Sequence, residues 1–175
     1  MPIGKAPKRV DRHALQQYAT LLLAQRAMSS GEMRQKLKLR ALSAADVEAV
    51  IEQLVEYGAL NDANYAAAYA SARKENQGFG QARVLRDLNK KRIPSELARD
   101  AVSATFEGTD ETAMIEDYLA RKFRGKNLPE YLSDPKHLAS AFRRLRTAGY
   151  SSSATLKVLR KHSSAAADIV EDDEN

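Results

Sequence analysis

Clusters of lysine and arginine recur at three places in this 175-residue chain, and their side chains point most directly to a chemistry. The clusters comprise Arg34, Lys36, Lys38 and Arg40; then Arg83, Arg86, Lys90 and Lys91; and finally Arg121, Lys122, Arg143, Arg144 and Arg146. Guanidinium and ammonium groups gathered in this way bind the phosphates of a nucleic-acid backbone or the carboxylates of an acidic protein surface. These residues are therefore the predicted partner- or DNA-binding residues.

A charged helix face can also serve solubility alone, and that reading applies to any single cluster. Recurrence argues against it here, because each cluster surrounds the start of the same spacing of apolar residues. Two apolar residues separated by four positions are followed by Ser or Pro in each case: Leu37 and Leu42 before Ser43, Leu88 and Ile93 before Pro94, Leu145 and Tyr150 before Ser151. The offsets are 51 and then 57 residues. One supersecondary unit is therefore predicted to occur in three copies.

Each copy is predicted to be a trio of helices whose second helix is the most basic. Apolar residues recur at i, i+3, i+4 and i+7 in the long segments, and glycine and proline are few. The fold class expected is all-α, an elongated curved array of three tandem three-helix repeats, nine helices in all, with short flexible termini. Stacked trios would extend about 60 Å and place the basic clusters in one stripe.

The predicted boundaries follow the helix caps and glycines. They are a basic N-terminal tail at 1–12, repeats at 13–60, 61–108 and 109–163, and an acidic disordered tail at 164–175. The third repeat contains a longer internal connection, Gly125 to Pro135, which accounts for the change in period. The tail holds five of the 23 acidic residues, so the rest of the chain is more basic than its net charge of +5 indicates.

Two details of packing can be predicted from the same pattern. The third helix of the first copy should pack through Val47, Val50, Ile51, Leu54 and Val55, and Asn61 or Asp62 should cap the next helix. The aromatic residues Tyr65, Tyr69, Tyr118 and Phe142 are interpreted as core; a stacking platform for single strands is the alternative.

No enzyme signature stands out, and we expect neither catalytic residues nor cofactors nor metal. The chain has no cysteine, and its three histidines are dispersed without a ligand-spaced partner, so each is expected at the surface. The glycines at 78 and 80 are better interpreted as a helix break than as a nucleotide-binding loop. No apolar run is long enough for a membrane span, and nothing suggests export, so we expect a cytoplasmic monomer without membrane contact.

The chain resembles the RecX family over roughly residues 14–161. Three segments carry the likeness. The first is Leu22 to Arg26 with Ser29 or Ser30, Glu32, Met33, Lys36 and Leu37; the second is Gly58 to Asp62 with Tyr65, Ala66, Tyr69, Arg73, Gly78, Gly80, Arg83, Leu88 and Lys91; the third is Arg121 to Phe123 with Phe142, Leu145 and Gly149 to Ser151. The family usually has glycine before the apolar residue that closes the second helix. Here Gly149 keeps it, whereas Ala41 and Arg92 replace it.

The resemblance implies a non-enzymatic regulator that binds the RecA recombinase filament on DNA. Such a regulator would modulate, and by expectation inhibit, filament growth, ATP hydrolysis and strand exchange in recombinational repair. Single- or double-stranded DNA would be contacted weakly or through the filament. The alternative is a DNA-binding protein that acts through the phosphate backbone independently of RecA.

Overall fold

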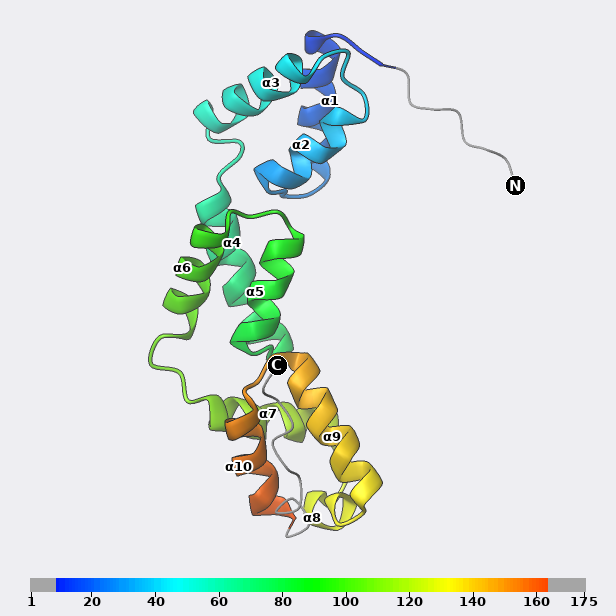
Figure 1. Ribbon diagram of the computed structural model, residues 1–175, viewed down its shortest axis with the longest axis vertical. Helices are drawn as coiled ribbons and strands as arrows, with labels where there is room; N and C mark the ends of the chain where they lie inside the picture. The colour runs from blue at the N-terminus through cyan, green and yellow to red at the C-terminus, as the bar shows by residue number, and fades with distance from the viewer. Residues whose placement is uncertain (1–8, 164–175) are drawn as a thin grey trace, which may run out of the picture. The chain divides into compact units, whose positions relative to one another are not determined.

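The computed structural model describes residues 9–163, and these residues form ten α-helices and one π-helical turn (Figure 1). The elements are α1 (Arg12–Gln25), α2 (Ser30–Lys38), α3 (Ala44–Glu56), α4 (Asp62–Ala72), η1 (Arg73–Gln77), α5 (Gln81–Lys90), α6 (Ser95–Phe106), α7 (Glu111–Lys122), α8 (Leu128–Leu132), α9 (Pro135–Ala148) and α10 (Ser152–His162). Extended pairing within this range is limited to one bridge between Val10 and Ala41. The all-α class is confirmed.

The predicted number of nine helices is wrong for the described residues. The additional helix, α8, lies inside the segment predicted to be a plain connection, because Pro129 suits a first helical turn and Leu132 is buried. The acidic tail at 164–175 and the first eight residues of the basic tail lie outside the described residues.

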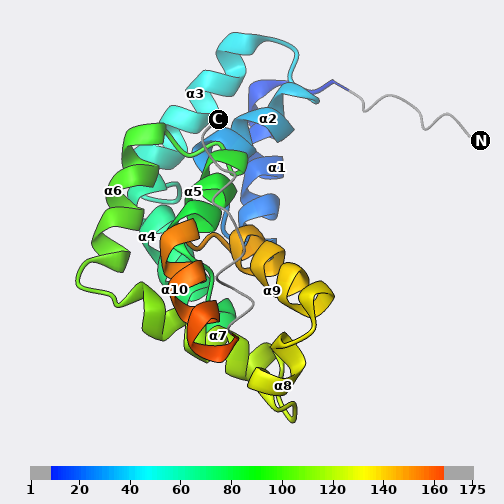
Figure 2. The same ribbon diagram turned by 60° about the horizontal axis from the view of Figure 1, so that its bottom comes forward.

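The chain forms two compact units, whose helices can be followed in Figures 1 and 2. The first unit comprises residues up to Ala68 together with Leu88–Ala101, and the second comprises Tyr69–Asp87 together with residues from Val102 onward. The chain crosses between the units inside α4, between Asp87 and Leu88 in α5, and inside α6. The division into three repeats and their placement in one array stay predictions.

The core of the first unit lies among α1, α2 and α3, which contact one another pairwise. It is built from Leu15, Ala19, Leu22, Met28, Met33, Leu37, Ala41, Val47, Val50, Ile51, Leu54 and Leu60. Four of the five residues predicted to bury the third helix belong to it. Val55 does not: its side chain is 51% exposed, because its position falls beyond the face that α3 presents to α1 and α2.

The core of the second unit joins α7, α8, α9 and α10. Its members are Ile115, Tyr118, Leu119, Leu132, Leu138, Ala141, Leu145, Ala148, Tyr150, Ala154, Val158 and Leu159. Of the aromatic residues predicted to be core, Tyr118 is buried, and Tyr65, Tyr69 and Phe142 are half-buried. Tyr118 meets Tyr150 edge to face, with ring centroids 5.8 Å apart.

Polar side chains cap most helices where the sequence predicts them. The hydroxyls of Ser29, Ser43 and Ser151 accept hydrogen bonds from backbone amides in the first turns of α2, α3 and α10. At α4 the capping side chain is Asn61, whose Oδ1 accepts from the Asn64 amide at 2.9 Å. Asp62 is not the cap, because its carboxylate is engaged elsewhere.

Asp62 joins the start of α4 to the start of α2 within the first unit. Its carboxylate accepts from the Ser30 amide at 2.7 Å and from the Ser30 hydroxyl at 2.5 Å. Beside it, the fully buried Ser29 hydroxyl donates to the carbonyl of Lys91, one residue beyond α5. A Cβ on Gly31 would lie 2.5 Å from the Arg92 carbonyl oxygen, so only glycine permits this approach.

Glu32 adds an ionic contact to the same place. It pairs with Lys91 at 3.1 Å and with Arg26 at 3.2 Å, and its side chain is only 16% exposed. Burial acts to raise the pKa of the Glu32 carboxyl, but hydrogen bonds from Arg26 and Lys91 outweigh it and leave that pKa below its usual value.

The second unit repeats this contact between the start of α5 and the end of α9. The Gly80 amide donates to the Ala148 carbonyl at 2.9 Å, and the Ala82 amide donates to the Gly149 carbonyl at 3.3 Å. Gly80 is 51 residues beyond Ser29, and Ala148 is 57 residues beyond Lys91, which are the two offsets of the sequence repeat. The copied spacing therefore marks a copied contact between second helices.

The turn that ends α5 is left-handed even though it lacks glycine. Arg92 has φ of 59°, and Gly149, at the equivalent position after α9, has φ of 96°. Ala41 is not among the described residues with positive φ. A left-handed conformation costs a side-chain-bearing residue about 1–2 kcal/mol, so Arg92 holds strain that Gly149 avoids.

Replacing Ser29 should destabilise the protein more than replacing another capping serine. Ser29→Ala removes the cap of α2 and leaves the Lys91 carbonyl without its buried donor, so we expect a loss of about 2 to 3 kcal/mol in the free energy of unfolding. Ser43→Ala removes only an exposed cap and should cost about 1 kcal/mol. Urea denaturation followed by circular dichroism measures both; equal losses would show that the Lys91 contact adds nothing.

Glycine should have opposite effects at the two departures from the family pattern. Arg92→Gly relieves the left-handed strain and should raise the free energy of unfolding by about 1 kcal/mol, although it removes an exposed hydrogen bond to Gln35. Ala41→Gly frees the unfolded backbone and removes a buried methyl group from the core, so it should lower the free energy of unfolding by about 1 to 2 kcal/mol. Urea denaturation of both variants measures these two changes. A lower free energy of unfolding for Arg92→Gly would show that the side-chain contacts of Arg92 outweigh the strain.

Candidate nucleic-acid interface

Four of the predicted binding residues are engaged in contacts that hold the fold. Arg34 pairs with Glu48 at 3.0 Å, Lys91 with Glu32 at 3.1 Å, and Arg83 with Asp87 at 3.2 Å. Arg146 donates to the carbonyl of Tyr150 at 2.6 Å. Such half-buried cations are less available to a partner, because a new contact would compete with an existing one.

The other predicted cations have no ion pair with a carboxylate among residues 9–163. They are Lys36, Lys38, Arg40, Arg86, Lys90, Arg121, Lys122, Arg143 and Arg144. All are exposed except the half-buried Lys36. Arg40 lies over the Tyr18 ring at 4.1 Å and Lys122 over the Tyr118 ring at 5.7 Å. This set can meet a polyanion without breaking an internal ion pair.

A groove in the second unit brings two of these cations, Arg143 and Arg144, together with Arg83. It has a volume of about 300 Å³ and lies between the start of α5 and the second half of α9, above Tyr118 of α7. The lining residues are Phe79, Arg83, Tyr118, Ser140, Arg143, Arg144, Thr147 and Ala148. Three guanidiniums and three hydroxyl-bearing side chains line it, and no carboxylate does. An anion such as a phosphate is the chemistry that fits this lining.

The repeated contact between second helices positions the groove. A Cβ on Gly80 would lie 2.4 Å from the Gly149 carbonyl oxygen, so the missing side chain lets α5 begin directly against the end of α9. Arg83 and Arg86 then donate to the Thr147 carbonyl at 3.2 Å and 3.3 Å. Cations at the carbonyl end of a helix are favoured by its dipole, so these arginines gather there for a physical reason.

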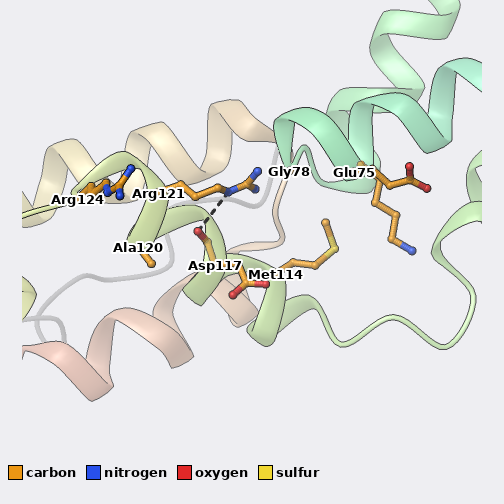
Figure 3. Close-up of a pocket in the computed structure, with 8 residues that line it drawn as sticks. Glu75, Gly78, Met114, Asp117, Ala120, Arg121 and Arg124 are labelled. Atoms are coloured by element: carbon orange, nitrogen blue, oxygen red, sulfur yellow. Dashed lines mark hydrogen bonds between the residues drawn. The ribbon is translucent and has the colours of Figure 1, made fainter.

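A larger cavity, of about 620 Å³, lies in the same unit along η1 and α7 (Figure 3). Its lining is of mixed charge: Lys74, Arg121 and Arg124 face the same space as Glu75 and Asp117. Figure 3 shows Arg121 reaching toward Gly78, with its Nε donating to the Asp117 carbonyl at 3.4 Å. Because the carboxylates offset the cations, this cavity suits a polyanion less well than the groove.

Sequence reasoning identified the arginines of the groove but missed its other walls. Phe79 was part of a glycine-flanked break, and the sequence shows only that a helix ends there. Its ring lies 4.8 Å from the Arg83 guanidinium carbon and forms one wall. Ser140 and Thr147 carry no distinguishing signal; they join the groove because they lie on the α9 face that turns toward α5.

The predicted stripe through all three clusters stays a prediction. The cations of α2 and Lys90 belong to the first unit, and the groove belongs to the second.

The histidines have specific neighbours. His13 is exposed, and His162 is half-buried and lies 2.7 Å from Glu116. No group of three or more metal-ligating side chains occurs among the described residues. Within the same range no helix is long and apolar enough to cross a bilayer.

The groove arginines should contribute to polyanion binding without supporting the fold. For Arg143→Gln combined with Arg144→Gln, we expect a change of less than about 0.5 kcal/mol in the free energy of unfolding. Binding to a single-stranded oligonucleotide should weaken, and the slope of log K against log salt should become shallower by about 1.4. Fluorescence anisotropy across a salt series measures this slope.

The matched control, Lys157→Gln with Arg160→Gln, removes two exposed cations of α10. The two double variants therefore have the same net charge. Equal weakening in both double variants would show that net charge alone governs binding and would contradict a role for the groove.

The comparisons with known proteins all point to one family. A family model described as the second three-helix domain of RecX matches residues 61–102. A regulatory protein RecX from Leptothrix cholodnii is 32% identical over 138 residues, covering 79% of this chain and 82% of that protein. One from Vibrio parahaemolyticus is 29% identical, covering 76% and 81%.

Solved structures agree with these relatives at the level of the fold. The crystal structure of RecX from Lactobacillus salivarius superposes with a TM-score of 0.65 at 18% identity, covering 86% of this chain and 96% of that one. The helices found here, the repeated contact between second helices and a relative matched over most of both chains lead to the same conclusion: the protein belongs to the RecX family of regulatory proteins.

Proposed function

We propose that this protein binds the RecA recombinase filament on DNA and inhibits filament growth, ATP hydrolysis and strand exchange. The observation that supports the proposal is the groove lined by Arg83, Arg143 and Arg144, which has no carboxylate of its own. Membership in a family of regulatory proteins supplies the regulatory role, and the groove supplies a surface for phosphates or acidic side chains.

The groove would act together with the exposed cations of the first unit. Lys38 at the end of α2, Arg40 in the turn after it and Lys90 at the end of α5 carry the same charge on a different part of the chain. Contacts made by linked parts of one chain reinforce one another through effective concentration, so individually weak contacts suffice. A filament offers repeated sites, which suits a protein made of repeated units.

Inhibition would follow from occupancy. A protein held on filament phosphates or acidic surface covers contacts that an incoming subunit or second DNA strand requires. Binding of this kind is electrostatic in large part, so its strength should fall steeply as salt rises.

The direct test is RecA's DNA-dependent ATP hydrolysis and filament length, measured over a wide range of this protein's concentration. We expect both to fall, and we expect the Arg143→Gln, Arg144→Gln variant to require at least about tenfold more protein for the same effect, since two charged contacts are lost. The Lys157→Gln, Arg160→Gln variant is the control of equal charge. Unchanged hydrolysis and filament length with the wild-type protein would overturn the proposal.

A second candidate function is DNA binding through the phosphate backbone independently of RecA. Arg143 and Arg144 of the groove, which are exposed and have no ion pair with a carboxylate among residues 9–163, favour it as well, because phosphates of bare DNA fit the same place. This function requires tight, strongly salt-dependent binding to bare DNA. A shallow salt slope, which means few phosphate contacts, would count against it.

A further inference from the structure

Three rings form a short ladder at the segment predicted to be a plain connection. Phe123 ends α7, Tyr131 belongs to α8, and His137 lies in the first turn of α9. The Phe123 and Tyr131 centroids are 5.2 Å apart with the planes tilted by 43°. The Tyr131 and His137 rings are stacked, 4.1 Å apart and within 12° of parallel. All three are half-buried, so the ladder borders solvent.

Cations accompany these rings. Lys126 Nζ lies 3.8 Å from the Tyr131 centroid, and the Arg144 guanidinium carbon lies 5.9 Å from the Phe123 centroid. His137 already covers one face of Tyr131 in parallel stacking, so Lys126 lies on the opposite face. The ladder therefore ends at His137, whose side chain is 45% exposed.

The ladder continues into the groove along one face of α9. His137, Ser140 and Arg144 are spaced i, i+3 and i+7, which places them on the same side of a helix. Ser140 and Arg144 line the groove. Arg144 follows His137 by seven residues, about 10 Å along the helix axis. One helix face thus connects exposed aromatic surface to a cluster of guanidiniums.

The carboxylate of Asp134, which lies beside His137, does not cover the ring face. Asp134 caps α9 and accepts from the Lys136 amide at 2.7 Å, and its other oxygen is 4.0 Å from His137 Nδ1. It therefore holds the start of α9 and the edge of the His137 ring, and it does not occupy the stacking face.

The geometry points to a binding surface for single-stranded DNA along α9, with a base stacked on His137 and phosphates held by Lys126, Arg143 and Arg144. Single strands offer free base faces, whereas the bases of a duplex are already stacked on one another. Aromatic rings next to a basic groove are the combination that such strands require. This inference rests on the proposed function for its DNA and specifies which form of DNA is contacted and where.

The test compares an oligothymidine of about twelve nucleotides with an abasic strand of equal length and charge, by fluorescence anisotropy without RecA. The wild-type protein should bind the thymidine strand about tenfold more tightly, because only that strand has bases to stack. His137→Ala should bind both strands equally, and His137→Phe should restore the preference, since it keeps a ring. His13→Ala, which removes an exposed histidine of α1, should leave the preference intact.

Each contrary outcome is distinct. Equal binding of the two strands by the wild-type protein would show that phosphates alone are contacted and would overturn the stacking role. Tighter binding of a duplex of the same length would overturn the choice of single strands. Absence of binding to any of them would also overturn the inference, and it would leave untouched an effect on RecA's ATP hydrolysis, which is measured separately. Circular dichroism establishes that each variant is folded.

Discussion

The rest of this structure depends on one constraint: the start of one helix lies close to the end of another. The start of α2 approaches the end of α5, and the start of α5 approaches the end of α9. At two places a helix start lies directly against a carbonyl that follows or ends another helix: Ser29 against Lys91 and Gly80 against Ala148. Both approaches exclude side chains, since a Cβ on Gly31 or Gly80 would come within 2.5 Å of a backbone oxygen. Small residues at these positions therefore decide how closely these helices approach one another.

The contact between α2 and the end of α5 and the contact between α5 and the end of α9 are made by different groups. In the first unit a serine hydroxyl reaches the carbonyl, and the carboxylates of Asp62 and Glu32 add hydrogen bonds and ion pairs around it. In the second unit backbone amides make the contact directly, and the Tyr150 hydroxyl donates to the Gly78 carbonyl at 2.5 Å. Burial raises the pKa of that hydroxyl, so it stays a donor throughout the ordinary pH range.

The position of the candidate interface follows from the contact between α5 and the end of α9. Seating α5 against the end of α9 brings Arg83 and Arg86 to the Thr147 carbonyl, and the face of α9 that carries Arg143 and Arg144 completes the groove. The protein belongs to a family of regulatory proteins. The proposed contact with a filament or with DNA would give Arg143 and Arg144 a partner of opposite charge. The short helix α8 adds the ring ladder beside it.

The sequence by itself determined every described α-helix except α8, most of the helix caps and the repeated spacing, because periodic burial and local hydrogen bonding act within a few residues of one another. It also located the basic clusters. It could not separate Arg34 and Lys91, which are held by internal ion pairs, from Arg143 and Arg144, because that depends on which carboxylate another helix brings near. Tertiary structure alone decided the groove, since it joins α5 to α9, and the approach of the left-handed Arg92 to Gly31, since these residues are distant in the chain. The ladder depends on how the segment between α7 and α9 packs around α8, which no local pattern reveals.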